Sequence, residues 1–392
     1  MVEIYESRED TFLILKEIKY YATGNVLDMG TGSGVLALEA AKTADYVFGA
    51  DINDDALEYA RAKAENLGIR NAEFVHSDLF SYFKIHPLKF DLIIFNPPYL
   101  PEDEKEPPES ALATTGGKKG YETLERFFSE ASYYLNPFGK ILVVFSTLTG
   151  KDKLHSIMES YSFNFQKLAE ESFFAETLFV YVAEKSELLK SLEAKGITHV
   201  KKLSKGHRGI IFTGKLLNVK VAVKKQREDI QVIGRIENEA RWLKVLNRKG
   251  IGPKILFVED GYFIYEFVEG EFLPDYLEKA SKENIKKVFT DVFKQCFVLD
   301  QRGISKEEMH HPLKHVLVKN NKAVLIDFER THATEKPQNV TQFCQYVSGV
   351  KVLKLLQEKG FKFTKTQITM AAKRYKKDIN EKNFKEIINA LK

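Results

Sequence analysis

Residues 25–34, NVLDMGTGSG, decide the fold of the first half of this chain. The stretch passes from a short apolar strand pattern into three glycines, and a helical pattern, SGVLALEAAKTA (33–44), opens among them. Glycine lets the backbone turn tightly and approach a ligand that a Cβ would exclude. The spacing is GxGxG, and Val35 stands where the dinucleotide fingerprint GxGxxG has its third glycine, so the pattern disfavours NAD.

The rest of the first half repeats this alternation of strand and helix. Helical patterns separate short apolar runs, and this spacing is typical of a mostly parallel sheet wound on both faces. We therefore predict a doubly wound α/β fold for this half. The expected strands are residues 25–30, 46–51, 73–78, 90–96, 139–146 and 176–185, and the expected helices are 33–44, 53–68 and 121–135.

Polar residues mark the ends of successive strands. Asp51 lies 19 residues beyond Gly32 at the end of the second strand, and Asp78 ends the third. Ligands of open α/β sheets bind in the crevice at these carboxyl ends. An acid on the second strand suits ribose hydroxyls, and a polar group on the third suits an adenine amino group.

The fourth strand, DLIIFNPPYL (91–100), ends in Asn96-Pro97-Pro98-Tyr99. Two prolines forbid further ladder hydrogen bonds, so a buried strand has no structural need for this ending. The Asn96 side-chain oxygen and the Pro97 carbonyl can accept both N–H bonds of a planar nitrogen, and Tyr99 offers a flat wall. The tetrapeptide is therefore predicted to orient a planar nitrogen acceptor. It does not distinguish adenine N6, guanine N2 and a glutamine amide.

Over residues 25–183 this order of motifs resembles the class I S-adenosylmethionine-dependent methyltransferases. The resemblance implies a Rossmann-like seven-stranded sheet and S-adenosylmethionine as cofactor. It also implies which residues hold that cofactor: Asp28, Gly30, Thr31, Gly32 and Gly34 at the amino-acid part, Asp51 at the ribose, and Asp78 with Leu79 at the adenine.

The N-terminal stretch YESREDTFLIL (5–15) resembles the opening of HemK-like release-factor glutamine methyltransferases, in their archaeal and eukaryotic branch. Glu9, Asp10 and Thr11 match the branch, whereas Ser7 replaces its usual proline. The stretch GGKKGYETLERFF also looks like this branch. The resemblance implies that Thr11 and Asn96 lie at the cofactor. It further implies methylation of the glutamine in the Gly-Gly-Gln loop of a release factor, and a small zinc-ribbon activator protein as partner.

The second half carries a further set of motifs, VKVAVKK (219–225), YEFVEG (265–270) and LIDFER (325–330), and their order over residues 200–335 resembles small atypical protein kinases of the RIO and PRPK type. VKVAVKK places Lys224 where kinases pair the ATP phosphates. Glu239 is its candidate ion-pair partner, with Glu237 as the second choice, and LIDFER places Asp327 at the magnesium-binding aspartate. SKGHRGIIFTGK (204–215) would be a shortened phosphate loop.

The catalytic loop departs from that pattern. Kinases have an aspartate, then an asparagine five positions later. Here His310 and His315 stand at those two positions, and EEMHHPLKHVLV contains no aspartate. His310 or Glu308 could act as the base, or the domain could be a pseudokinase. The histidines 310, 311 and 315 also allow a metal site.

Charge divides the chain into two halves. Residues 1–184 carry 17 basic and 30 acidic side chains, a net charge of −13, whereas residues 185–392 carry 42 and 25, a net charge of +17. We expect a methyltransferase domain over 1–184, a helical linker over 185–199, and a kinase-like domain with a helical tail over 200–392. The basic half could meet RNA, the ribosome, nucleotide phosphates or an acidic protein, or be a solvated lysine-rich surface.

The cysteine content and the lengths of the apolar stretches indicate where the protein is located. The two cysteines lack zinc spacing, and no apolar stretch approaches the roughly 18 residues of a spanning helix, so we expect a cytoplasmic protein without membrane contact. The leading hypothesis is a glutamine N5-methyltransferase of a release factor, fused to a divergent kinase-like domain that could bind ATP and Mg²⁺. The alternatives are a nucleic-acid N-methyltransferase with a basic RNA- or DNA-binding half, and a second half that is a pseudokinase or a ribosome-binding scaffold.

Overall fold

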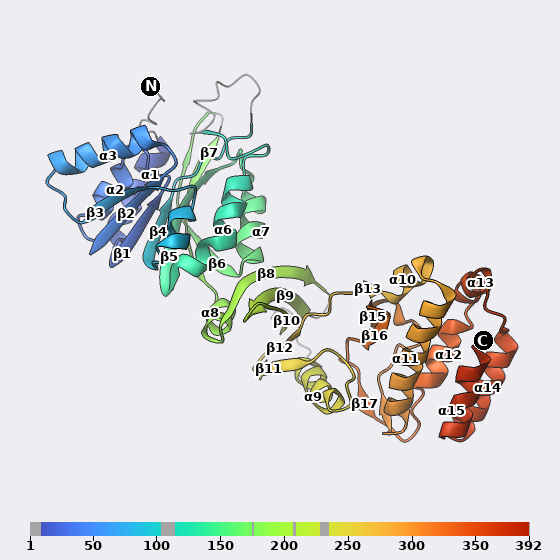
Figure 1. Cartoon of the computed structure of the whole chain (residues 1–392). Coiled ribbons are helices and arrows are strands. Elements are labelled where there is room, and N and C mark those ends of the chain that lie inside the picture. Colours follow the sequence, from blue (N-terminus) through green and yellow to red (C-terminus); the bar gives the residue numbers. More distant parts are fainter. Residues whose placement is uncertain (1–8, 103–113, 175, 207–208, 228–234, 392) are drawn as a thin grey trace. The chain divides into compact units, whose positions relative to one another are not determined.

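The computed structural model divides into two compact units (Figure 1). It describes the chain except for residues 1–8, 103–113, 175, 207–208, 228–234 and 392. Unit 1 comprises Met1–Leu203 and Thr213–Asn218, and unit 2 comprises Ser204–Phe212 and Val219–Lys392. The chain therefore passes between the units three times: within the strand Ile197–Lys205, within the strand Gly209–Leu216, and after Asn218.

Unit 1 is built on a seven-stranded sheet of order β3-β2-β1-β4-β5-β7-β6. Strands β1 to β5 run parallel, whereas β7 is antiparallel to both of its neighbours. This confirms the predicted seven-stranded, doubly wound α/β fold. The strands are β1 Asn25–Met29, β2 Tyr46–Asp51, β3 Ala72–His76, β4 Phe90–Phe95, β5 Leu135–Ser146, β6 Phe163–Ser172 and β7 Thr177–Lys185.

Helices cover both faces of this sheet, which explains why its central strands are continuous apolar runs. In β4, Leu92 and Ile94 pack in one core cluster with apolar residues of α1, α2 and α3. Phe95 points the other way, and its ring centroid lies 4.5 Å from that of Phe127 on α6. The helices are α1 Glu9–Tyr21, α2 Val35–Ala40, α3 Asp54–Asn66, α4 Ser81–Ile85, α6 Glu122–Tyr134, α7 Lys151–Ser160 and α8 Glu187–Ala194.

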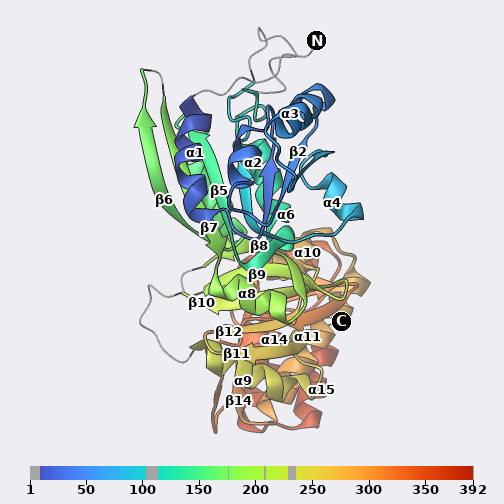
Figure 2. The same cartoon turned by 90° about the vertical axis from the view of Figure 1, so that its left-hand side faces the viewer.

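Strand β6 was not predicted from the sequence, and α2 is shorter than predicted. Figure 2 shows β6 at one edge of the sheet. Most of its side chains are half-buried or exposed, and it carries several charges. Charged edge strands lack the apolar pattern from which strands are predicted. The helix predicted over 33–44 begins only at Val35 and ends at Ala40, because Gly34 has a left-handed backbone and turns follow Ala40.

The second half contains antiparallel sheets. A five-stranded sheet has the order β11-β12-β10-β9-β8, and β15 and β16 form a hairpin around Asn320 and Asn321. The strands are β8 Ile197–Lys205, β9 Gly209–Leu216, β10 Val219–Gln226, β11 Ile255–Glu259, β12 Tyr262–Glu266, β13 Glu271–Phe272, β14 Ile304–Ser305, β15 Val316–Lys319, β16 Lys322–Leu325 and β17 His332–Ala333.

The longest stretch of helix after β13 is α11, which runs unbroken over Lys282–Asp300 with Ser281 as its N-cap. The tail is helical, as predicted. The remaining helices are α9 Arg235–Asn247, α10 Leu273–Lys279, α12 Asn339–Val347, α13 Val350–Glu358, α14 Lys365–Lys377 and α15 Glu381–Ala390. None of the described helices is both long and apolar enough to cross a membrane.

Candidate functional site

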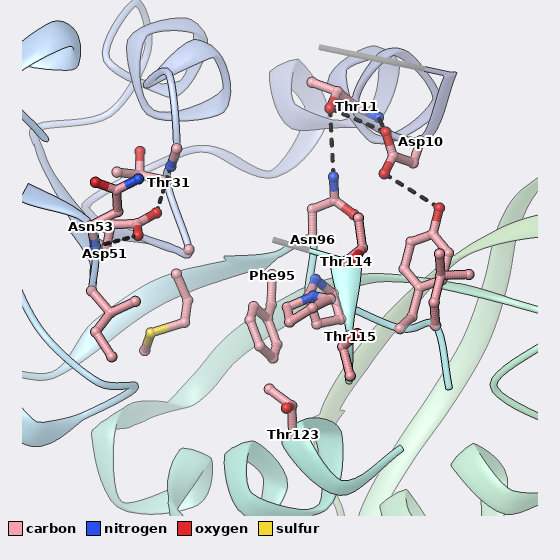
Figure 3. A pocket seen from close by; sticks show the side chains of 18 of the residues that line it. Asp10, Thr11, Thr31, Asp51, Asn53, Phe95, Asn96, Thr114, Thr115 and Thr123 are labelled. Atoms are coloured by element: carbon pink, nitrogen blue, oxygen red, sulfur yellow. Dashed lines mark hydrogen bonds between the residues drawn. The ribbon is translucent and has the colours of Figure 1, made fainter. Parts of the chain in front are cut away.

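A cavity of unit 1 opens at the carboxyl ends of its parallel strands (Figure 3). Its volume is about 870 Å³. Ligand pockets of drug-sized molecules typically have about 300–1,000 Å³. The walls come from the start of α1, the glycine loop after β1, the ends of β2, β3 and β4, and the start of β7. The predicted strand-end residues therefore meet around one space.

Two glycines of the loop have different structural roles. Gly32 has φ +51°, and a Cβ placed on it would meet nothing within 4 Å, so its backbone borders open space in the cavity. Gly34 has φ +75°, and a Cβ there would lie 2.9 Å from the Cβ of Ala60 on α3. Gly32 thus exposes backbone to a ligand, whereas Gly34 allows two helices to touch.

The side chain of Asp28 stabilises the glycine loop through hydrogen bonds. Its Oδ2 atom accepts hydrogen bonds from the Thr31 hydroxyl (2.7 Å) and from the Ala37 N–H (3.0 Å). Its Oδ1 atom is buried without a hydrogen-bond partner among the described residues. Burial raises the pKa of Asp28 to about 7, although these two hydrogen bonds lower it. The side chain is completely buried and does not line the cavity.

Asp51 braces the glycine loop from the end of β2. One carboxylate oxygen accepts the Gly32 N–H at 2.8 Å, and the other accepts the Asn53 N–H at 2.9 Å. Asn53 in turn caps α3. Each carboxylate oxygen has a further lone pair, so Asp51 can still accept hydrogen bonds from hydroxyl groups in the cavity.

Asp78 is already paired. Both of its carboxylate oxygens accept hydrogen bonds from Arg126 on α6, at 3.0 and 2.8 Å. The neighbouring Leu79 has a left-handed backbone with φ +47°. The buried Ser77 hydroxyl donates to the Leu79 carbonyl at 2.5 Å and so fixes this turn. Arg126 and Ser77 were not predicted from the sequence, because nothing in their local pattern marks them as partners of the third strand's end.

Asn96 stands at the end of β4 with one half of its amide unused. Its Nδ2 atom donates to the Thr11 hydroxyl of α1 at 3.5 Å (Figure 3). Its Oδ1 atom is buried and has no hydrogen-bond partner among the described residues. An unpaired buried oxygen costs about 1–3 kcal/mol, so such an atom in a cavity indicates a donor supplied by a ligand.

Tyr99 is held from two sides. Its hydroxyl donates to Oδ2 of Asp10 at 3.5 Å, and its carbonyl accepts the Thr149 hydroxyl at 3.3 Å. A second loop packs against the same turn: a Cβ on Gly116 would lie 2.6 Å from the Pro98 carbonyl oxygen, and one on Gly120 would lie 2.6 Å from that of Tyr99. The glycines of GGKKG therefore allow this loop to lie against the Asn-Pro-Pro-Tyr turn.

Most of the residues predicted at the cofactor and the acceptor line this cavity. Only Asp28 and Gly34 do not. Residues 5–8, which belong to the N-terminal stretch that resembles the HemK-like branch, lie outside the described part of the chain. The predicted residues that line the cavity are Thr11, Gly30, Thr31, Gly32, Asp51, Asp78, Leu79, Asn96, Pro97 and Tyr99.

Unit 2 brings together three of the four predicted nucleotide-site residues. Lys224 Nζ lies 2.5 Å from Glu239 Oε2 and 3.3 Å from Asp327 Oδ1. Glu239 also accepts the Phe328 N–H at 3.2 Å, which ties α9 to the segment after β16. Burial lowers the pKa of Lys224, but the carboxylates of Glu239 and Asp327 more than offset this effect and hold that pKa above its ordinary value.

His310 is not part of this group. Its side chain is exposed, and its described contact is with the ring of His311, 4.7 Å away between centroids. No set of three or more His, Cys, Asp or Glu side chains in the described chain is arranged to hold a metal ion, so the histidine metal site has no support there. In the predicted phosphate loop, the Gly206 N–H donates to the Gly209 carbonyl, whereas residues 207–208 lie outside the described chain.

The residues of the cavity in unit 1 fit S-adenosylmethionine. The cavity has room for it, and the open backbone at Gly32 leaves space for a close approach. Asp51 has spare acceptor capacity for a ribose, and the Asn96 side-chain oxygen has no hydrogen-bond partner among the described residues. These hydrogen-bond acceptors suit a polar ligand that carries a ribose.

Comparisons with known proteins agree with this geometry. The "Methyltransferase small domain" family matches residues 9–175. A Methanocaldococcus jannaschii protein named "Putative protein N5-glutamine methyltransferase" is 41% identical over 152 residues, covering 38% of this chain and 75% of that protein. A release factor glutamine methyltransferase of Shewanella oneidensis is 34% identical over 149 residues, covering 35% of this chain and 51% of that one.

A solved structure, the E. cuniculi Mtq2–Trm112 complex described as methylating the eRF1 translation termination factor, is 25% identical. The alignment covers 46% of this chain and 98% of that one, with a TM-score of 0.37. The chain thus spans three quarters of the archaeal relative and about half of the bacterial one. Through residues 9–175 it belongs to the methyltransferase small domain family, a family of S-adenosylmethionine-dependent enzymes whose members include protein N5-glutamine methyltransferases.

Proposed function

We propose that unit 1 transfers a methyl group from S-adenosylmethionine to the side-chain amide nitrogen of a protein glutamine. The proposed acceptor is the glutamine in the Gly-Gly-Gln loop of a translation release factor. One observation carries this proposal: within the described part of the chain, the Asn96 side-chain oxygen is buried without a hydrogen-bond partner, in a cavity whose other walls suit the methyl donor. The names of the archaeal and bacterial relatives support glutamine as the acceptor class.

The proposed cofactor residues follow the walls of the cavity. Asp28 supports the loop of Gly30, Thr31, Gly32 and Gly34, which would face the amino-acid part. Asp51 would accept the ribose hydroxyls, and Asp78 with the backbone at Leu79 would meet the adenine. Thr11 would close the site from above, since its hydroxyl already accepts the Asn96 N–H.

When bound, the cofactor supplies an electrophilic methyl group on a sulfonium sulfur. An amide nitrogen is a poor nucleophile, because its lone pair is conjugated with the carbonyl. The Asn96 side-chain oxygen and the Pro97 carbonyl would accept its two N–H bonds and orient that lone pair. The Tyr99 ring, held by Asp10 and Thr149, would form a wall against the planar amide. Positioning of this kind can supply up to about 7–11 kcal/mol of a barrier.

The test is transfer of radiolabelled methyl groups to purified release factor, to its loop Gln→Ala variant, and to tRNA, rRNA and DNA. We expect label in the release factor alone and none in its Gln→Ala variant. Label that survives the Gln→Ala change, or that enters only nucleic acid, would mean that the chain is a nucleic-acid methyltransferase instead.

Substitution of Asn96 tests whether its side-chain oxygen binds the methyl acceptor. Asn96→Ala should lower methyl transfer at least about 100-fold while cofactor affinity changes less than about threefold, because the lost contact is to the acceptor. Asn66→Ala, the same change at an exposed position on α3, is the matched control. A large loss of cofactor affinity in Asn96→Ala would show that the residue supports the fold or the cofactor.

We also propose a small zinc-ribbon activator protein as a partner, which the resemblance to the HemK-like branch implies. Co-expression with such a protein should raise soluble yield and methyl-transfer rate. The same resemblance favours a cytoplasmic location, where release factors act.

For the second half we propose a kinase-like domain over residues 200–392, joined by a linker over 185–199 to a methyltransferase domain over 1–184. The observation behind it is the contact of Lys224 with Glu239 and Asp327. Lys224 would meet the nucleotide phosphates, and Asp327 would hold Mg²⁺.

Lys224→Met should lower the affinity for Mg·ATP at least tenfold. Lys254→Met, at an exposed ion pair with Glu266, should leave that affinity unchanged. Equal affinities in both variants would contradict the assignment.

A further inference from the structure

A second unpaired oxygen borders the cavity of unit 1, and it belongs to Glu176. The Oε2 atom of this side chain is buried and has no hydrogen-bond partner among the described residues. Glu176 lines the same cavity as Asn96, but it was not predicted from the sequence and has no role in the methyl transfer proposed above. A buried carboxylate oxygen is costly to leave without a donor, so its place in a cavity indicates that a ligand supplies one.

Main-chain hydrogen bonds fix the position of Glu176 immediately before β7. Its carbonyl accepts the Phe173 N–H at 2.7 Å, which links the residue after β6 to the residue before β7. The next residue, Thr177, donates its N–H to the Thr147 hydroxyl at 3.0 Å, and its carbonyl accepts the Thr147 N–H at 3.0 Å. The side chain of Glu176 therefore projects from a backbone that two neighbouring segments hold in place.

The order of the strands shows which part of the cavity Glu176 borders. Strand β7 is antiparallel to β5, with Ser146 opposite Leu178, so β7 begins at the edge of the sheet where the parallel strands end. The proposed cofactor residues at the ends of β1, β2 and β3 lie on one side of Asn96, which follows β4. Glu176 lies on the other side, two strands further along this edge. It therefore borders the part of the cavity that is left for the methyl acceptor.

The spacing between Asn96 and Glu176 suits one glutamine residue. Neighbouring strands lie about 4.8 Å apart, so the end of β4 and the start of β7 are separated by roughly 10 Å. Four bonds of about 1.3–1.5 Å join the Cα atom of a glutamine to its amide nitrogen, which gives an extended length of roughly 5 Å. A hydrogen bond at each end adds about 2.9 Å. A glutamine that offers its side-chain amide to Asn96 can therefore place its main chain beside Glu176.

We propose that Glu176 is a specificity-determining residue that binds the main chain of the methyl-accepting segment. Its Oε2 atom accepts a hydrogen bond from a backbone N–H of the Gly-Gly-Gln sequence, donated by the glutamine or by the glycine before it. This role rests on the function proposed above. Glycine has no side chain, so backbone N–H groups are the donors that this segment offers beside its glutamine. A segment with proline in place of that residue lacks the N–H and would be a poor substrate.

The experiment measures methyl transfer by the full chain to purified release factor. Glu176→Ala should raise KM for the release factor about tenfold or more, the usual effect of losing a hydrogen bond to a charged group. Because this bond is present before and during transfer, kcat should stay within about threefold. The affinity for S-adenosylmethionine should also stay within about threefold. Glu176→Gln, which keeps an acceptor oxygen, should give an intermediate KM.

Glu171→Ala is the matched control for Glu176→Ala. Glu171 is an exposed residue of β6 and lies outside the cavity, so its removal should leave KM and kcat at the wild-type values. The melting temperature of Glu176→Ala should not fall, because the lost oxygen has no hydrogen-bond partner in the described fold. A higher KM together with a lower melting temperature would assign Glu176 to the fold and overturn the proposal.

A change in the substrate identifies the donor. Two release factors are assembled by protein ligation with an ester in place of one amide, either before the glutamine or before the second glycine, so that each lacks one N–H. One of the two esters should raise KM of the wild-type chain about tenfold, but that of Glu176→Ala by less than about threefold, because the bond is already absent.

Two results would overturn the role of Glu176 alone: an unchanged KM in Glu176→Ala, or ester effects of equal size in the wild type and in Glu176→Ala. In both cases the wild-type chain still methylates the glutamine. A wild-type chain that methylates no glutamine would overturn the proposed function itself, so the two failures are distinguishable.

Discussion

Carboxylates at the strand ends of unit 1 have structural partners within the fold in addition to their predicted roles at the cofactor. Asp28, predicted at the cofactor, is buried beneath the glycine loop and bonds Thr31 and Ala37. Asp78, predicted at the adenine, already forms an ion pair with Arg126. Residue type and strand position are visible in the sequence, but the partner of each carboxylate depends on segments far along the chain.

The raised pKa of Asp28 gives unit 1 a pH dependence. The pKa is about 7 in the fold, against 3.8 as its ordinary value. A group whose folded pKa is raised contributes stability below its unfolded pKa, and that contribution is lost as pH rises through the folded value. Local stability around β1 should therefore fall between about pH 4 and 7. Asp28→Asn, which stays neutral, should flatten this slope.

Hydrogen exchange of peptides covering residues 25–38, converted to protection factors at pH 5 and pH 8, measures this effect in the whole chain. Peptides of α11 serve as an internal reference in unit 2. An equal pH slope in the wild type and in Asp28→Asn would show that another group titrates.

Arg126 should compete with the cofactor for Asp78. The pair is about half exposed on both sides, and exposed pairs contribute at most about 1 kcal/mol. If Asp78 meets the adenine, Asp78→Ala should weaken S-adenosylmethionine binding about tenfold or more. Arg126→Gln should instead raise the affinity for S-adenosylmethionine by up to about fivefold, because no ion pair with Arg126 then has to break before Asp78 binds the cofactor. Calorimetry measures both affinities.

Lys84→Gln is the control for Arg126→Gln, since Lys84 forms an exposed pair with Glu130 outside the cavity. Weakening by Arg126→Gln to the same extent as by Asp78→Ala would mean that the two side chains bind the cofactor as one unit.

At the scale of elements, the site depends on how loops meet the ends of strands. Strands β1 to β5 were all predicted from the sequence, because their apolar runs are buried on both faces of the sheet. Strand β6 was missed because its side chains are largely exposed and charged. The contact between the GGKKG loop and the Asn-Pro-Pro-Tyr turn was also not predicted from the sequence. This contact includes an isolated β-bridge between Leu100 and Thr115, and an isolated bridge leaves no periodic pattern in the sequence.

Gly116→Ala should test that loop contact. The new Cβ would lie 2.5 Å from the Gly120 carbonyl oxygen and 2.6 Å from that of Pro98, so one of the two backbones must move. We expect kcat of methyl transfer to fall at least about tenfold, because small displacements of positioning groups are costly. Cofactor affinity should stay nearly unchanged, since the cofactor residues lie on other loops.

Gly68→Ala is the control, because a Cβ at Gly68 meets nothing within 4 Å, although its φ of +69° adds backbone strain. The two variants are compared by single-turnover methyl transfer and by thermal melting. A Gly116→Ala chain with wild-type kcat would show that the turn does not depend on this loop.

For the whole molecule, the unequal charge of its halves predicts a salt-sensitive interaction. Residues 185–392 carry a net charge of +17. If this half contacts ribosomal RNA, binding releases counterions, and affinity should fall about 1,000-fold or more between 50 and 200 mM salt for six or more phosphate contacts. Fluorescence anisotropy of labelled rRNA fragments measures this loss.

A double variant, Lys373→Gln with Lys377→Gln on the exposed side of α14, should reduce the salt slope. Lys42→Gln with Lys63→Gln in unit 1 should leave it unchanged. Binding that is weak and independent of salt would favour a solvated lysine-rich surface in place of an RNA contact.

The sequence by itself determined the doubly wound fold of unit 1, the edge of the sheet where the site lies, and the turn that holds Asn96. These features are local, because glycines, prolines and apolar periodicity act over a few neighbouring residues. Only the tertiary structure decided which polar groups meet: Asp78 with Arg126, Tyr99 with Asp10, and Glu308 with His315. Such partners are distant in the chain or set by strained turns, and packing rather than local propensity brings them together.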